Sequence, residues 1–303
     1  MLWRENVKQL NDSENSNALA IGAMIRISLS SLSNTEQRII EWMMTKGNLK
    51  PRTSIKEVAE ALSVSEPLLV KVSKKLGYSG FREIRSALLS YFDALPFEKE
   101  QELSEKDNVE NIIEKVFNNS VQALKEAQSI VDAKIISKAA EWIFHANRIV
   151  ILGVGGSAIV GEDFEHKLLR IGIHSHTYSD NHLMVMVASQ LKENDVVIAI
   201  SQSGNTAEIC NAILVAKKNQ AKIICITNNH QSELAEISDL SIFSPAKNGP
   251  LLGQNAAARI IQLTLLDTLF IAIVVLDHEK SKVHLERSID VVKPLHKKTL
   301  SNQ

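Results

Sequence analysis

The stretch Ser201-Gln202-Ser203-Gly204-Asn205-Thr206 lies between two apolar segments of different spacing. The run before it, 195–200, is typical of a buried strand, and the spacing over 207–213 predicts a helix. A hydroxyl-rich turn in this position can hold an anion, because the first N–H groups of a helix lack internal partners and the helix dipole is positive there. Gly204 has no Cβ, so the backbone can approach a ligand closely. An ordinary capped turn is the plainer alternative, since Ser, Asn and Thr are good helix caps.

A second turn of similar composition follows another apolar run. Residues 147–152 predict a strand, 153–158 form a glycine-rich turn ending in Ser157-Ala158, and a helix is expected to about 171. Both turns would then meet at the carboxyl edge of a parallel sheet, where such sheets bind ligands. The spacing Gly153, Gly155, Ala158 also fits a dinucleotide fingerprint, but 173–176 lacks the acid expected about 20 residues on. With no Gly-Lys-Ser/Thr run in the chain either, a compact phosphorylated ligand is favoured.

The two turns together resemble those of the sugar isomerase (SIS) fold, a phosphosugar-binding α/β module. The Ser-Gln-Ser-Gly form is similar to that in the SIS domains of glucosamine-6-phosphate synthases, and the resemblance covers about residues 138–278. It implies that the phosphosugar is contacted by residues of the two turns, namely Gly155, Ser157, Ser201, Gln202, Ser203, Gly204 and Thr206.

Composition limits the classes of function. The 303-residue chain is 45% hydrophobic and has a formal charge of -1, so any DNA-binding surface must be local. The two cysteines, Cys210 and Cys225, have no metal-type spacing and indicate packing in a reducing compartment. Residues 1–17 are polar and mixed in charge, so we expect neither a signal peptide nor a membrane anchor there. The apolar stretch 256–276 is interrupted by three polar residues and predicts a buried helix, placed at a subunit interface, rather than a membrane span.

The N-terminal third has the pattern of a helix-turn-helix. Residues 54–57 form a capping box, the helix that they begin ends near Ser63-Val64, and Ser65 is expected to cap a second helix that stops at Gly77. Five basic residues against two acidic ones give 65–85 a local positive charge, which suits contact with DNA phosphates. A solvated helix face is the alternative interpretation of such charges. The charged stretch 97–108 predicts a linker.

This order of domains resembles the RpiR family of bacterial transcriptional regulators. The similarity is carried by segments on both sides of the linker: 55–62, 64–66, 70–78, 80–82, 250–253 and 258–267. It implies that the second helix and its surroundings contact DNA through Ser65, Glu66, Leu68, Lys71, Lys74, Lys75 and Arg82. The chain departs from the family at Ser63, where Gly is common, and at Glu66-Pro67-Leu68, so the operator sequence is not implied.

Two other functions, those of a sugar-phosphate isomerase and of a metal-binding protein, would each need their own set of side chains. An aldose–ketose phosphate isomerase with a DNA-binding appendage would need a placed base, for which Glu165, His166 and His182 are the candidates. Adjacent Glu165 and His166 cannot both point at one site from a helix. A metal site at His174, His176 and His182 lacks an evident fourth ligand. We therefore expect neither catalysis nor a metal or other cofactor.

The sequence thus predicts an all-α helix-turn-helix domain followed by an α/β three-layer SIS domain with a mainly parallel sheet. We expect a cytoplasmic transcriptional regulator of sugar catabolism, a repressor, that binds a double-stranded DNA operator and a phosphorylated sugar effector. It is expected to be a homodimer or homotetramer with no membrane contact. The predicted divisions are an N-terminal tail 1–21, the DNA-binding domain 22–98, a linker and connecting helix 99–137, the SIS domain 138–278 and a C-terminal tail 279–303.

Overall fold

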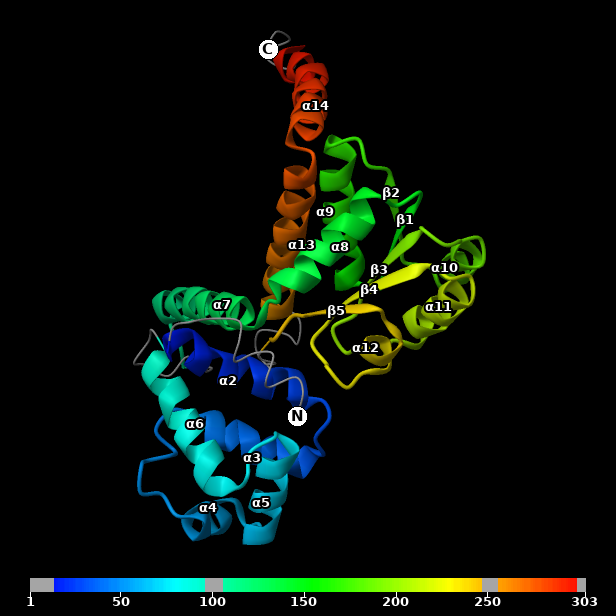
Figure 1. The fold of residues 1–303 in the computed structure, drawn as a ribbon. Coiled ribbons are helices and arrows are strands. Elements are labelled where there is room, and N and C mark those ends of the chain that lie inside the picture. Colours follow the sequence, from blue (N-terminus) through cyan, green and yellow to red (C-terminus); the bar gives the residue numbers. More distant parts are fainter. Residues whose placement is uncertain (1–13, 96–105, 247–255, 299–303) are drawn as a thin grey trace. The chain divides into compact units, whose positions relative to one another are not determined.

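The computed structural model describes residues 14–95, 106–246 and 256–298 (Figure 1). Residues 1–13 of the predicted tail 1–21, residues 97–105 of the predicted linker and the family segment 250–253 therefore lie outside the described residues. The helices before the sheet are α2 (Glu14–Leu29), α3 (Asn34–Met44), α4 (Ile55–Leu62), α5 (Glu66–Lys75), α6 (Phe81–Ala94), α7 (Val109–Ile130) and α8 (Ala133–Phe144). The remaining elements are β1 (Ile149–Gly153), α9 (Gly156–Arg170), β2 (Ser175–Tyr178), α10 (Asn181–Ala188), β3 (Val196–Ile200), α11 (Ala207–Lys218), β4 (Lys222–Thr227), α12 (Glu233–Ile237), β5 (Leu240–Phe243), α13 (Ala256–Leu276) and α14 (His278–Lys298).

The chain divides into two compact units. One contains Met1–Val131 with the short segments Asn228–Gln231 and Phe243–Ile261, and we call it the helical unit. The other contains Asp132–Thr227, Ser232–Ile242 and Gln262–Gln303, and we call it the α/β unit. The connecting helix α7 therefore belongs to the same unit as the predicted DNA-binding helices, and the predicted C-terminal tail 279–303 is helical over α14.

The helical unit is built on a core of aliphatic and aromatic side chains from α2 to α6, including Ile39, Ile40, Leu69, Ile84 and Leu88. Capping boxes begin both α3 and α4: Ser33 pairs with Glu36, and Ser54 pairs with Glu57 as predicted. The turn after α4 is tight because Ser63 takes the left-handed conformation, with φ 53°. Glycine adopts this conformation without steric cost, which gives a physical reason for the glycine usual there in the family.

The α/β unit contains a five-stranded sheet in the order β2-β1-β3-β4-β5 (Figure 1). The pairs β1–β2, β1–β3 and β3–β4 are parallel. Every residue of β1 and β3 is buried, as expected for strands covered on both faces. Helices α10 and α11 pack on one face, and α9 packs on the other, so the predicted three-layer α/β architecture with a parallel sheet is confirmed.

Helix α13 is long and apolar enough to cross a membrane by length and composition, and about 33% of that stretch is buried. Its residues Ile261, Leu266, Leu269 and Ile273 are fully buried, whereas Ile271 and Val275 are exposed. The prediction of a buried helix is therefore correct for one face only. The core helix of a globular domain can have the same length and composition.

Candidate functional site

The turn after β3 is organised by its own hydroxyl groups. Ser201 Oγ accepts a hydrogen bond from the Gly204 N–H at 3.1 Å and lies 2.8 Å from Thr206 Oγ1, and Ser203 Oγ accepts from the Asn205 N–H at 3.2 Å. Ser201 is buried, so its hydroxyl lies inside the turn and fixes its shape, while Ser203 is exposed. The backbone of Gly204 is left-handed, with φ 66°. The described part of α11 has no side-chain capping bond, so its N-terminal end is open to a ligand.

The turn after β1 begins at the same level of the sheet and, like the turn after β3, contains a glycine with positive φ. Gly153 pairs in register with Ile200, so both turns begin side by side at the carboxyl ends of adjacent strands. Gly155 stands at the N-cap of α9 with φ 57°, and no side-chain capping bond is present among the described residues of this helix either. A Cβ on Gly153 would lie 2.8 Å from the backbone of Ser157, which explains why the turn needs glycine there.

The strand order makes this edge a candidate binding position. The chain runs from β1 outward to β2 and then returns to β3 on the other side of β1, so the order reverses between β1 and β3. Ligands of open α/β sheets bind at such a reversal, outside the carboxyl ends of the strands. The positive ends of two helices, α9 and α11, follow these two strands. This arrangement suits a compact anion such as a phosphate.

Thr227 and Ser232 support the turn after β3 and were not among the predicted site residues. A Cβ built on Gly204 would lie 2.1 Å from Ser232 Oγ and 2.7 Å from Thr227 Oγ1, so these two side chains pack directly against the turn. The Gly204 carbonyl accepts the Leu234 N–H at 3.0 Å, and Asn205 Oδ1 accepts the Glu233 N–H at 3.1 Å. The signal available in the sequence was the polar residue that ends the apolar run 222–227.

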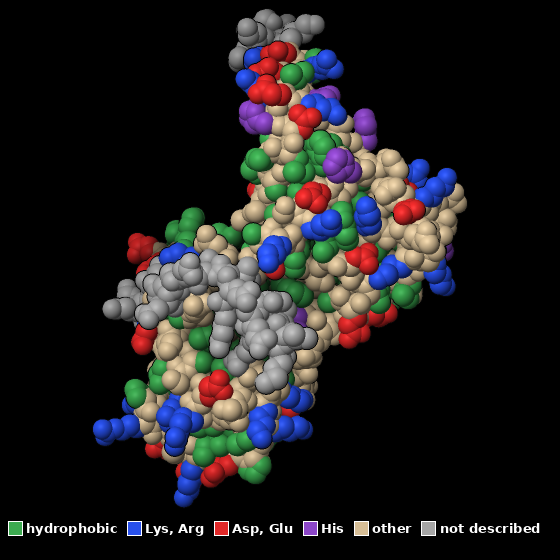
Figure 2. Space-filling view, viewed as in Figure 1, with side chains coloured by type: hydrophobic (Ala, Val, Ile, Leu, Met, Phe, Trp, Pro, Cys, Tyr) green, Lys and Arg blue, Asp and Glu red, His purple; other side chains and the backbone are tan. Residues whose placement is uncertain are grey.

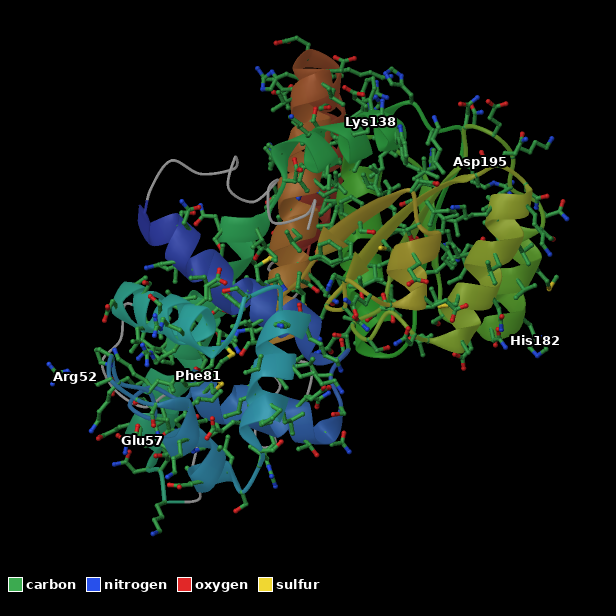
Figure 3. All side chains as sticks on the ribbon, turned by 60° about the horizontal axis from the view of Figure 1, so that its bottom comes forward. Arg52, Glu57, Phe81, Lys138, His182 and Asp195 are labelled. Carbon is green, nitrogen blue, oxygen red and sulfur yellow. The ribbon has the colours of Figure 1, made fainter. Side chains whose placement is uncertain are left out.

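The candidate isomerase base has a structural partner. One oxygen of Glu165 accepts the Thr177 N–H at 2.7 Å, and the other lies 3.2 Å from the His176 ring nitrogen. Glu165 thus satisfies a backbone N–H of β2, which lies at the edge of the sheet. His166 is exposed on α9, and His182 is exposed on α10, where Figure 3 shows it at the periphery of the ribbon. The described residues contain no group of three or more His, Cys, Asp or Glu side chains that could hold a metal ion.

The cysteines fill packing positions, as predicted. Cys210 lies in α11 and Cys225 in β4, and both are free and buried. Burial raises the pKa of the Cys210 thiol to about 11 and raises the pKa of Cys225 as well. Both thiols are therefore protonated at neutral pH and are poor nucleophiles.

The predicted recognition helix is α5, and its polar face is exposed. Leu69 and Val72 are buried in the core of the helical unit, while Lys71 and Lys74 are exposed. Ser65 stands at the N-cap, but among the described residues its hydroxyl makes no capping hydrogen bond, so the prediction of a side-chain cap is wrong. Pro67 explains why the helix starts there nevertheless, because its fixed φ favours the first turn. Leu68 is half-buried, and Glu66 and Arg82 are exposed.

Lys75 differs from the other predicted DNA contacts because it has an acidic partner. Its ammonium lies 2.7 Å from Glu36 Oε2, and the Glu36 side chain is only 3% exposed. The same carboxylate oxygen accepts the Ser33 N–H at 2.9 Å in the capping box of α3. The hydrogen bond from Lys75, followed by that from Ser33, lowers the pKa of Glu36 to about 2. Lys75 therefore ties α5 to α3.

Basic side chains gather over α4 and α5 at one end of the helical unit (Figure 2). Lys50 and Arg52 are also exposed in the loop before α4, where Figure 3 shows Arg52 projecting outward. Neither residue is among the predicted DNA contacts, because the local positive charge was expected only within 65–85. Arg85 anchors this loop to α6 by donating to the Thr53 carbonyl at 2.6 Å.

A buried ion pair attaches α7 to the DNA-binding helices. Arg26 Nε of α2 lies 2.5 Å from Glu126 Oε2 of α7, and Glu126 Oε1 accepts from Tyr91 Oη of α6 at 2.6 Å. Gln122 Nε2 donates to both Tyr91 Oη and Glu126 Oε1, at 2.7 and 2.8 Å. Burial alone lowers the pKa of Arg26, but Glu126 and Tyr91 more than compensate, so the pKa of Arg26 is raised.

Fold and site together define a helix-turn-helix protein joined to an α/β anion-binding module, and comparison with known proteins identifies the class. Residues 20–94 match the helix-turn-helix domain of the rpiR family, and residues 142–272 match the SIS domain. The chain belongs to the RpiR family of transcriptional regulators. The predicted resemblance is therefore confirmed.

Three proteins illustrate the similarity. The HTH-type transcriptional regulator RpiR of Escherichia coli K12 is 42% identical over 93% of this chain and 95% of its own length. An HTH-type transcriptional regulator of Caldanaerobacter subterraneus is 31% identical over 89% of this chain and 96% of its own. The structure of Vibrio vulnificus NanR complexed with ManNAc-6P has a TM-score of 0.58 and 25% identity, and the match covers 90% of this chain and 99% of that one. The sequence relatives are regulators, so the prediction of a regulator rather than an isomerase is confirmed.

Proposed function

We propose that this protein is a cytoplasmic repressor of sugar catabolism genes whose affinity for its operator is controlled by a phosphorylated sugar. The observation that carries the proposal is the pair of serine- and glycine-rich turns that open side by side at the reversal of strand order. The phosphate is proposed to lie between the starts of α9 and α11, within reach of Gly155, Ser157, Ser201, Gln202, Ser203, Gly204 and Thr206. The structure of NanR complexed with ManNAc-6P supports this class of ligand.

The proposed DNA surface is the polar face of α5. Lys71 and Lys74 project from the face opposite the buried Leu69 and Val72, which suits entry into a major groove. Ser65, Glu66 and Leu68 lie at the start of the helix, and Arg82 adds charge from the start of α6. Because a two-fold operator needs two such helices, the working form is proposed to be a homodimer or a homotetramer.

The effector must bind the two states of the regulator unequally in order to act. A ligand with equal affinity for the DNA-bound and DNA-free arrangements would shift nothing, however tightly it bound. We therefore propose that effector binding at the α/β unit changes the free-energy difference between these arrangements. The division of the chain proposed from the sequence, with 22–98 as the DNA-binding domain and 138–278 as the SIS domain, is consistent with this scheme.

The ligand proposal is tested by binding. The purified protein is incubated with aldose and ketose phosphates of five and six carbons and with ManNAc-6P, and the shift of the thermal unfolding midpoint is measured. Ser203→Ala with Thr206→Ala removes two donors to phosphate, each worth about 1.5–3 kcal/mol when charge-assisted. Affinity should therefore fall at least 100-fold. Ser189→Ala, which removes an exposed hydroxyl just after α10, is the matched control.

The regulatory proposal is tested with DNA selected from a random duplex library by the full-length protein. The best-binding phosphosugar from the thermal screen is then titrated into the protein–DNA complex, and release is followed by fluorescence anisotropy. The double hydroxyl variant should bind DNA normally and lose the response to the phosphosugar. If it still responds at the concentrations that suffice for the unchanged protein, the phosphate binds elsewhere.

A further inference from the structure

Helix α7 carries an exposed apolar stripe that no other described element covers. Val109, Ile113, Phe117 and Val121 recur every fourth position and therefore share one face of the helix. Phe117 is 69% exposed and Val109 is 70% exposed, which is unusual for large apolar side chains so regularly spaced. Figure 2 shows hydrophobic side chains along the outer edge of the region occupied by α7.

The opposite face of α7 is fixed within the helical unit. Glu126 lies nine positions after Phe117, which is a half-turn offset at 3.6 residues per turn. That buried carboxylate pairs with Arg26 and accepts from Tyr91, so it ties α7 to α2 and α6. The stripe is thus held on a rigid element and faces away from the core of its own unit.

We propose that this stripe pairs antiparallel with the same stripe of a second copy of the chain. A two-fold axis at Phe117 places the two Phe117 rings against each other and sets Ile113 of one copy opposite Val121 of the other. Such an isologous contact is self-complementary and closes as a dimer. Burying regularly spaced aromatic and aliphatic side chains on both partners supplies the driving force.

The charges beside the stripe select the antiparallel direction. Glu110 lies seven positions before Phe117 and Lys125 eight positions after it, so the two side chains stand about 10 and 12 Å from the axis along the helix. In the antiparallel pair, Glu110 of each copy therefore faces Lys125 of the other. A parallel pair would bring like charges together at Glu110, Glu114 and Lys125. All three are exposed and can respond to a facing charge.

Cross-linking of the full chain tests the geometry, and it needs neither DNA nor effector. The native thiols are buried, so an introduced surface cysteine is the reactive one. In Phe117→Cys the two new thiols meet at the axis, and mild oxidation should give a disulfide-linked dimer. Val109→Cys, equally exposed, is the control, because the two copies of position 109 would be about 24 Å apart and a disulfide spans at most about 7 Å between Cα atoms.

A charge swap tests the same pairing with Phe117 intact. Lys125→Glu should weaken self-association in sedimentation equilibrium by about tenfold, because two ion pairs become two repulsive contacts. Adding Glu110→Lys to the same chain should restore it. Three results would each overturn the proposal. They are efficient cross-linking of Val109→Cys, no cross-linking of Phe117→Cys, and failure of the Lys125→Glu, Glu110→Lys variant to recover self-association. Loss of operator or effector binding alone would leave the pairing standing and count against the proposed function instead.

Discussion

Gly204→Ala is expected to destabilise the α/β unit severely, because the turn after β3 has no room for a methyl group. The left-handed backbone at φ 66° costs an L-residue about 1–2 kcal/mol. The added Cβ would also lie 2.1 Å from Ser232 Oγ and 2.4 Å from Ser232 Cβ. Relieving such an overlap costs about 1–3 kcal/mol.

Ser232 cannot move away freely, because its hydroxyl accepts the Ala235 N–H at 3.2 Å as the N-cap of α12. Losing that cap costs about a further 1 kcal/mol. The total loss is therefore about 3–6 kcal/mol. The matched control is Gly155→Ala, which also has a positive φ, at 57°, but no described atom within 4 Å of the new Cβ. It has only the backbone cost of such a conformation, about 1–3 kcal/mol.

Native-state hydrogen exchange gives the assay, since it reports the opening free energy of each segment separately. Protection of the β3 and β4 amides should fall about 100-fold or more in Gly204→Ala, and about tenfold in Gly155→Ala. The amides of α3 and α6 in the helical unit serve as the internal reference and should not change. Equal losses in the two variants would show that crowding by Ser232 does not limit the turn, and the packing argument would fail.

Three further outcomes follow from the helical unit. The double variant Lys71→Ala, Lys74→Ala should weaken operator binding by about 1–3 kcal/mol and reduce its salt dependence, while its melting temperature stays unchanged. Unchanged operator affinity in fluorescence anisotropy would exclude α5 as the recognition helix. Glu36→Gln should lower the unfolding free energy at pH 7 by about 1–3 kcal/mol. Because the pKa of Glu36 is lowered from 4.5 to about 2, the stabilisation by its carboxylate is complete above about pH 4.5 and is lost as the pH falls toward 2, so urea titrations of the two proteins should converge there. Glu126→Ala leaves the Arg26 charge buried without its carboxylate partner and should lower the opening free energy of α2 by about 3–5 kcal/mol, measured by hydrogen exchange. A loss below about 1 kcal/mol would show that the ion pair does not hold α2 and α7 together.

The order of the elements could be read from the sequence because it depends on local patterns. Apolar runs mark β1 and β3, glycine and hydroxyl residues mark the turns after them, and the Ser54–Glu57 capping box marks the start of α4. These signals arise from residues within one or two turns of each other, and their meaning does not depend on distant parts of the chain.

The features that needed the tertiary structure join residues far apart in the sequence. Glu36 and Lys75 are 39 positions apart, and Arg26 and Glu126 are 100 apart, so neither pair leaves a local pattern. Ser65 looks like a helix cap in sequence, yet its hydroxyl is not used as one, because Pro67 and the packing of Leu69 position α5 without it. The sequence by itself determined which segments become strands, turns and helices, since backbone propensity and apolar spacing are local. Only the folded chain decided that Ser232 limits the space beside Gly204, that Lys75 has an acidic partner, and that α7 belongs with the DNA-binding helices, because burial and charge pairing are set by which elements pack together.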